Sequence, residues 1–241
     1  MPTVEEPACR MEIEIPAQPT NTSCGQTCLH AVYKYWRREI PIEQLIEEVP
    51  TVEGGGTIAV HLGLDALRRG YDARLYTYNL PVFDPTWFVP KRQNLREKLK
   101  AELLVRKGKR RGAIRAYLDF IEAGGDIRFE DLTPGLIRRL LRRHGPVLTG
   151  LSSTYLYRDK RENPNTCEDD DIGGEPAGHF VVLSGYHPGE GTVSVSDPYD
   201  ANPLSELREY DVPIARLINA ILLGVLTYDG NLLVIQPRKS S

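Results

Sequence analysis

Three apolar segments near the end of the chain constrain its fold more than any other feature. His179–Tyr186, Thr192–Ser196 and Leu232–Ile235 are rich in branched and aromatic residues and are bounded by turn-forming residues, which is typical of strands. Segments with helical periodicity lie mostly earlier, so too few helices separate these strands for a wound parallel sheet. The sequence therefore predicts an α+β fold in which an N-terminal helical part packs on a C-terminal antiparallel sheet.

Length and composition suit one folded domain without a membrane segment. The chain has 241 residues, of which 41% are hydrophobic and 26% charged, which is ordinary for a globular protein and excludes disorder, collagen and coiled coil. Its first fifteen residues have no basic start and no apolar core, and its longest apolar run, at Ile214–Leu226, is shorter than the ~20 residues of a membrane helix. We expect a single domain over residues 1–241, a cytoplasmic location and no contact with a membrane.

Charge is distributed unevenly along the chain. The formal net charge is −3, yet Lys91–Arg143 contains 16 Lys and Arg against 7 Asp and Glu. Two basic helices are predicted there, over 94–104 and 113–123, and they indicate a basic helical insertion at about 82–127. One interpretation is a solvated helical surface, and the other is a face that steers an acidic peptide toward a cleft. Nucleic acid is not an expected partner, because the segment lacks interleaved aromatic residues.

A polar loop followed by an amphipathic helix places one cysteine where a nucleophile is expected. The helix is predicted over Cys24–Trp36, and Thr22 or Ser23 can cap its first N–H groups. Four residues fall at offsets that share one helical face: Cys24, Cys28, Ala31 and Tyr35. The partial positive charge at a helix N-terminus favours a thiolate, and the thiolate is the nucleophilic form. Cys24 is therefore the candidate nucleophile, and the alternative is a buried structural cysteine.

Two neighbours of Cys24 suit the same chemistry. Gln18 precedes it by six residues across a turn, so its amide can return and donate a hydrogen bond to an oxyanion formed at the sulfur. Gly25 has no side chain and is expected to leave room for a substrate carbonyl. The alternative for Gln18 is an ordinary loop residue.

A cysteine nucleophile needs a base, and His179 is the best placed of the five histidines. It follows Gly178 and leads an apolar strand, so we expect it to point from the sheet rim into a cleft. The other four are expected to be exposed or partly buried without a catalytic role: His30, His61, His144 and His187.

An acid should hold the imidazole in one tautomer, and Asp197 ends the strand that follows His179. If the register pairs Val181 with Asp197, then His179 and Asp197 are diagonal neighbours on one face, about 7–8 Å apart. A slip of one residue would put them on opposite faces. The alternative is a turn acid ahead of Pro198. Two further acids are weaker candidates for this role: Asp200 and Asp211.

Together these residues resemble the papain-like cysteine peptidases of the bacteriocin-leader-processing (double-glycine peptidase) type, family thirty-nine of the cysteine peptidases. The similar motifs are Gln18, Cys24-Gly25, Gly178-His179-Phe-Val-Val-Leu, Gly185-Tyr186, Asp197-Pro198, Gly56-Thr57 and Gly145-Pro146-Val147. The resemblance implies a papain-like fold and hydrolysis of a peptide or isopeptide/amide bond through a thioester. It implies Cys24 as the nucleophile, His179 as general base and later acid, and Asp197 as the acid that orients His179. Gln18 and the Cys24 N–H would bind the oxyanion.

Some positions refine this resemblance. The family usually has an acid directly before the cysteine, where this chain has Ser23. Two later stretches, Leu151–Tyr157 and Gly224–Asp229, are closer to a stand-alone cytoplasmic bacterial offshoot. That offshoot is often encoded beside ATP-grasp ligase or acetyltransferase-like proteins. The resemblance therefore implies such a partner, a peptide or protein substrate, and no cofactor.

Metal and phosphate sites are alternatives to be weighed. Cys24, Cys28 and His30 could begin a zinc site, but structural zinc needs four ligands, and the remaining cysteines, Cys9 and Cys167, are isolated. No metal is therefore expected, and Cys28 is interpreted as core, with a redox role beside Cys24 as the alternative. The loop Gly54–Thr57 could cradle a phosphate, but no Lys follows as in a P-loop, which favours a tight turn.

Other functions share the same chemistry. Amidases, deamidases and acyl transferases also use a Cys–His–Asp site and pass through a thioester. A non-catalytic peptide-binding module on the same fold is a further class. The four candidate positions are all filled by residues able to act, which favours an enzyme.

Overall fold

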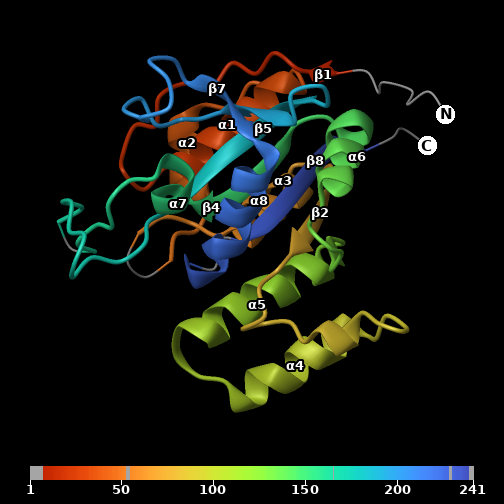
Figure 1. Cartoon of the computed structure of the whole chain (residues 1–241). Coiled ribbons are helices and arrows are strands. Elements are labelled where there is room, and N and C mark those ends of the chain that lie inside the picture. The colour runs from red at the N-terminus through yellow and green to blue at the C-terminus, as the bar shows by residue number, and fades with distance from the viewer. Residues whose placement is uncertain (1–7, 53–54, 165, 228–229, 239–241) are drawn as a thin grey trace.

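An eight-stranded sheet forms the centre of the computed structural model, which describes residues 8–52, 55–164, 166–227 and 230–238 (Figure 1). The strand order is β3-β2-β8-β4-β5-β6-β7, and β1 pairs with β5. The strands are β1 Cys9–Arg10, β2 Tyr71–Thr77, β3 Asp126–Arg128, β4 Val147–Ser152, β5 Gly178–His187, β6 Thr192–Ser196, β7 Glu209–Pro213 and β8 Asn231–Pro237. All named pairings are antiparallel except that of β2 with β3, which is parallel. The predicted α+β class with a largely antiparallel sheet is confirmed.

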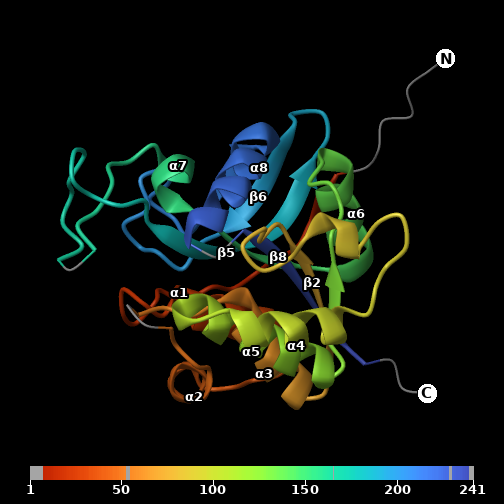
Figure 2. The same cartoon turned by 90° about the horizontal axis from the view of Figure 1, so that it is seen from below.

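Helices cover both faces of this sheet (Figure 2). The helices are α1 Cys24–Tyr35, α2 Ile42–Glu48, α3 Ala59–Arg68, α4 Leu95–Val105, α5 Gly108–Glu122, α6 Pro134–His144, α7 Ser153–Tyr157 and α8 Ile214–Leu223, with 3₁₀ turns η1 Pro85–Trp87 and η2 Gly224–Thr227. One face is covered by α1 and α3, and the other by α6, α7 and α8. None of the helices within the described ranges is both long and apolar enough to cross a bilayer.

Alternating strand residues divide the interior into two apolar clusters, as the period of two in a strand requires. Phe180 and Val182 of β5 pack with α1 and α3 in one cluster. Val181 and Leu183 of the same strand pack with α6 and α8 in the other. The continuous apolar character of β5 therefore reflects burial on both faces rather than on one.

The basic segment does not form one surface. Helices α4 and α5 pack together outside α3, whereas α6 lies against the opposite face of the sheet (Figures 1 and 2). Residues 91–122 contain eleven basic and four acidic residues, and α6 contains four arginines and no acid. The net positive charge of the segment is thus divided between two separate places.

Two sequence patterns at the N-terminal side predict local structure that does not form. Alternating polarity predicts a strand over Met11–Ile15, and Thr57 is predicted to cap the helix that starts at about Ile58. The alternating segment Met11–Ile15 is not a strand: β1 is Cys9–Arg10, and Met11 only donates its N–H to Ser184 O at 2.7 Å. Its alternation still marks burial, because Ile13 and Ile15 are buried while Glu12 and Glu14 face solvent. Thr57 does not cap α3, whose N-cap is Ile58.

Candidate active site

Cys24 is the first residue of α1, and α1 packs against β5. The predicted side-chain cap is absent: the Ser23 hydroxyl donates to Thr20 O and accepts from the Thr20 N–H, both at 3.0 Å. The first N–H groups of the helix are therefore not occupied by a cap. Their partial positive charge lies at the end of the helix that Cys24 begins, and Cys24 is largely buried.

Gly25 has a packing role that differs from the one expected. A Cβ on this residue would lie 2.6 Å from Thr57 Cγ2 and 3.3 Å from Phe180 Cδ2. The missing side chain therefore lets α1 approach the start of α3 and strand β5 closely. The expectation that Gly25 leaves room for a substrate carbonyl is wrong.

A β-bulge sets the register that brings His179 and Asp197 together. Near the hairpin turn, His187 of β5 pairs with Thr192 of β6. The register then shifts between Leu183 and Gly185, and the pair farthest from the turn is Val182 with Ser196. The extra residue moves the register by one, so the next pair along would be Val181 with Asp197. In this register His179 and Asp197 are diagonal neighbours on one face of the sheet. Without the bulge, His179 and Asp197 would lie on opposite faces.

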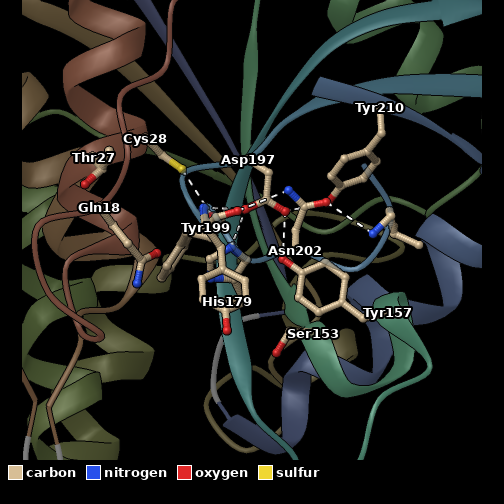
Figure 3. Close-up of polar contacts among 12 residues, drawn as sticks. Gln18, Thr27, Cys28, Ser153, Tyr157, His179, Asp197, Tyr199, Asn202 and Tyr210 are labelled. Atoms are coloured by element: carbon tan, nitrogen blue, oxygen red, sulfur yellow. Dashed lines mark hydrogen bonds and ion pairs between the residues drawn. The ribbon is translucent and has the colours of Figure 1, made fainter. Parts of the chain in front are cut away.

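The carboxylate of Asp197 accepts four hydrogen bonds although its side chain is fully buried (Figure 3). Oδ1 accepts from His179 Nε2 at 2.8 Å and from the backbone N–H of Tyr199 at 2.9 Å. Oδ2 accepts from the hydroxyl of Tyr157 at 2.7 Å and from that of Tyr210 at 2.5 Å. The structure therefore places the candidate base and acid in direct contact.

The electrostatics of this pair favour an imidazolium beside a carboxylate. Burial lowers the pKa of His179, but the Asp197 charge, its hydrogen bond and the interaction with Cys24 outweigh burial and raise that pKa to about 10. Burial raises the pKa of Asp197, but His179 and the two tyrosine hydroxyls outweigh it and bring the pKa below its usual range. Because Nε2 faces the carboxylate, Nδ1 is the imidazole nitrogen left for Cys24.

Gln18 is tied to the turn that follows Asp197. Its backbone N–H donates to Pro198 O at 2.9 Å, and its side-chain Nε2 donates to Thr20 O at 3.0 Å. One amide hydrogen is thereby used, and Nε2 carries a second. The carbonyl oxygen Oε1 is buried and has no hydrogen-bond partner within the described part of the chain. Figure 3 places Gln18 on the α1 side of His179.

The other histidines and acids are engaged elsewhere. The four remaining histidines hydrogen-bond as follows: His30 to Ile40 O, His61 to Pro50 O, His144 to Gln236 Oε1 and His187 to Ser194 Oγ. Asp200 pairs with Arg208, and Asp211 accepts from Ser194. Neither weaker acid candidate takes the position of Asp197.

Cys28 is buried in the core, as predicted. Its Sγ donates to Phe180 O at 3.2 Å, and burial raises its pKa well above the usual range. A thiol that holds its proton so firmly is a poor redox partner for Cys24. Across the described ranges there is no group of three or more His, Cys, Asp and Glu side chains that could hold a metal ion.

The glycine-rich loop before α3 contains tight turns. Gly55 donates its N–H to Val52 O, and Val52 donates to Gly56 O, both at 3.0 Å. Gly55 and Gly56 have φ of 89° and 73°, a left-handed conformation that favours glycine. Two other residues of this loop, Glu53 and Gly54, lie outside the described residues.

Three tyrosines of the Asp197 network have little signal in the sequence. Tyr157 lies in the stretch Leu151–Tyr157, which only the family resemblance marks, and Tyr199 follows Asp197 by two residues. Tyr210 is on β7, and no sequence signal connects it to this site. The second stretch, Gly224–Asp229, meets the first: a Cβ on Gly224 would lie 2.9 Å from Leu151 Cα. Tyr228 and Asp229 lie outside the described residues.

Comparison with known proteins links this fold to peptidases. No protein-family model matches the chain, and no curated protein sequence matches significantly. One similar structure is a double glycine motif protease from an AMS/PCAT transporter in complex with the leader peptide, at 16% identity, TM-score 0.45 and 95% coverage of both chains. Another is the peptidase domain of Streptococcus ComA, a bi-functional ABC transporter involved in quorum sensing, at 14% identity, TM-score 0.46, and 94% and 100% coverage of this and that chain.

A third structure has a higher TM-score than these two. It is a protein of Bacillus anthracis assigned as a C39-like peptidase, with 13% identity, TM-score 0.50, and coverage of 98% of this chain and 100% of that chain. At this identity the similarity establishes the fold and not the activity. The chain therefore has the α+β fold of a C39-like peptidase, as its sequence resemblance implied.

Proposed function

We propose that the chain is a cysteine peptidase that hydrolyses a peptide or isopeptide/amide bond through an acyl-enzyme at Cys24. The observation that carries this proposal is the 2.8 Å hydrogen bond between His179 Nε2 and the buried Asp197, with Cys24 interacting with the same imidazole. The N-terminus of α1 adds support, because its first N–H groups have no side-chain cap and remain available to the groups that react at Cys24. The fold shared with a C39-like peptidase is compatible with this chemistry.

In the first half-reaction, the Cys24 thiolate attacks the carbonyl carbon of the scissile bond. The new carbon–sulfur bond pushes the carbonyl electrons onto oxygen. The His179 imidazolium then gives its Nδ1 proton to the leaving nitrogen, the carbon–nitrogen bond breaks, and a thioester remains. Asp197 keeps the proton on Nε2, so Nδ1 is the nitrogen that exchanges protons with the substrate.

The second half-reaction releases the acyl group. Neutral His179 accepts a proton from water as that water attacks the thioester, and the Cys24 thiolate leaves. The oxyanion formed in each half-reaction would accept hydrogen bonds from the Cys24 N–H and from Gln18 Nε2. The bond from the Gln18 N–H to Pro198 O supports this role, because it fixes the Gln18 backbone to the turn after Asp197.

We further propose that residues 1–241 form a single domain with an insertion at about 82–127, and that the substrate is a peptide with an acidic segment. The loop 158–177 leads directly into β5 and has seven acidic and three basic residues. The basic surface is on α4 and α5, so the acidic part of a substrate would lie over those helices and not over the loop beside His179. A cytoplasmic location and an ATP-grasp or acetyltransferase-like partner stay predictions from the sequence.

A peptide library tests the peptidase proposal most directly. The wild-type chain should cleave a subset of peptides, and Cys24→Ala should abolish cleavage, as read by mass spectrometry. Cys9→Ala, which removes a thiol on β1, is the matched control and should cleave the same peptides. Cleavage that survives in Cys24→Ala, or no cleavage by the wild type, would contradict the proposal. Conversion of side-chain amides without chain cleavage would point to a deamidase instead.

A further inference from the structure

Two tyrosines on separate elements converge on one oxygen of Asp197. Tyr157 comes from α7, and Tyr210 comes from β7, the edge strand beside β6. Their hydroxyls donate to Oδ2, while His179 and the Tyr199 N–H occupy Oδ1 (Figure 3). Both carboxylate oxygens are thus held by two donors each, which fixes the plane of the carboxylate as well as its position.

The short helix α7 is anchored so that Tyr157 can reach this point. A helix of five residues is not stable by itself and depends on tertiary contacts. Ser153 donates its N–H and its hydroxyl to Ala177 O, and the Thr154 hydroxyl accepts the Ala177 N–H at 2.9 Å. These bonds attach the start of α7 to the residue that precedes β5. The helix that supplies Tyr157 is therefore fixed next to the strand that supplies His179.

Asp126 of the same chain has a carboxylate whose partners differ from those of Asp197. Asp126 forms ion pairs with three arginines, Arg74, Arg92 and Arg128, at 2.8–3.1 Å. Within the described residues, Asp197 has no such pair with Lys or Arg, and His179 is its charged partner. Neutral hydroxyls satisfy the oxygens of Asp197 without cancelling its charge. That charge is therefore available to the imidazolium of His179.

The two hydroxyls keep their protons and can donate to the ionised carboxylate. Burial and the neighbouring Asp197 charge raise the pKa of Tyr157 and of Tyr210 far above the usual range. While Asp197 is ionised its carboxylate has no proton to give, so both hydroxyls donate to Oδ2 and neither accepts from it.

We propose that Tyr157 and Tyr210 are positioning residues that keep Asp197 ionised and oriented, so that His179 holds its proton on Nε2 and presents Nδ1 to Cys24. This role rests on the function proposed above. Neither tyrosine touches the reacting atoms, and each acts through Asp197. Tyr157 is the last residue of α7, and the helix brings its hydroxyl to the carboxylate.

The test uses Tyr157→Phe, Tyr210→Phe and the double variant in the full chain, with a peptide that the wild type cleaves. Each single variant should lower kcat about tenfold with KM unchanged, because Asp197 then restricts the orientation of the His179 imidazole less tightly. Without the hydroxyls Asp197 binds a proton at higher pH, and the imidazolium then loses its counter-charge. The midpoint for iodoacetamide labelling of Cys24, located by mass spectrometry, should therefore move to higher pH.

Tyr155→Phe is the matched control. It removes a hydroxyl from the same helix, but that hydroxyl hydrogen-bonds Asn219 and not Asp197. Wild-type kcat in both single variants, or a lower kcat with an unmoved labelling midpoint, would overturn the positioning role. If the double variant melts at a much lower temperature than the wild type, the positioning role is judged from the two single variants. Each of these keeps one hydroxyl that donates to Oδ2. Absence of Cys24-dependent turnover in the wild type would instead count against the peptidase proposal, and the labelling profiles would still test the network.

Discussion

The ionic contacts of the candidate site and those of the basic helices differ most in their exposure to water. The side chains of His179 and Asp197 are 9% and 0% exposed, whereas those of Arg96 on α4 and Glu122 on α5 are 52% and 40% exposed. Both pairs have similar distances, 2.8 Å and 2.9 Å. The two pairs therefore differ in their exposure to water and not in the distance between their charged atoms.

This difference has a physical consequence for what each region can do. In the buried region water cannot compete for polar groups, so each hydrogen bond is strong and each unmade bond is costly. On the exposed helices, ion pairs contribute roughly 0.2–1 kcal/mol and are screened by salt. Substitutions in the buried network should therefore change activity and stability by much larger factors than substitutions on α4 and α5.

The largest expected effect is on turnover after loss of the candidate base. His179→Ala should lower kcat/KM by about 10³-fold, because general acid–base catalysis by a positioned side chain contributes roughly 10²–10⁴-fold. His187→Ala is the matched control, since it removes a histidine from the other end of β5. Peptide cleavage by both variants measures the contrast. Equal losses in the two variants would show that the pairing of His179 with Asp197 has no special role.

Glycine-to-alanine substitutions on helices of the two regions should change the free energy of unfolding in opposite directions. Gly25→Ala on α1 should destabilise the fold by about 1–3 kcal/mol, because its Cβ would lie 2.6 Å from Thr57 Cγ2. Gly112→Ala on α5 should stabilise it by about 0.5–1 kcal/mol, because a Cβ there meets no atom within 4 Å and alanine favours helix. Urea unfolding of both variants gives the two free energies, and the same sign for both would contradict the packing account.

The buried pair should also make stability depend on pH. Because folding raises the pKa of His179 to about 10, its contribution is full below the ordinary histidine pKa and is lost as pH rises through about 10. Folding lowers the pKa of Asp197, so its contribution is present above the ordinary aspartate pKa and is lost as pH falls below it. Thermal melting across pH should therefore show a loss on the alkaline side that is smaller in His179→Gln. An alkaline loss of equal size in that variant would assign it to other groups.

The smallest expected effect concerns the exposed basic helices. Cleavage of a peptide with an acidic segment should slow by a factor of a few as salt rises from low to physiological ionic strength, because exposed charges are screened beyond about 8–10 Å. Lys107→Gln and Arg110→Gln, at the start of α5, should reduce that dependence. A neutral peptide of the same length is the control. Equal salt dependence for both peptides would leave the basic surface with a solubility role only.

Local sequence patterns were informative where the neighbours along the chain decide the outcome. The helix that begins at Cys24 follows from its apolar spacing, and β5 follows from the run of branched residues after His179. Patterns failed where distant groups decide. Ser23 was expected to cap α1, but its hydroxyl bonds to Thr20, and Gly25 is constrained by Thr57, which is far away in sequence.

The sequence by itself determined which residue types were available for chemistry and where the helix and strands that carry them begin. The tertiary structure decided whether they meet. The one-residue shift of register between Leu183 and Gly185 gives His179 and Asp197 a common face. The backbone is crowded at this point, because a Cβ on Gly185 would lie 2.8 Å from Cys9 O. Tyr210 reaches Asp197 only because β7 pairs with β6. Helical periodicity is local and can be read from neighbours, whereas register and convergence depend on contacts between segments that the linear pattern does not contain.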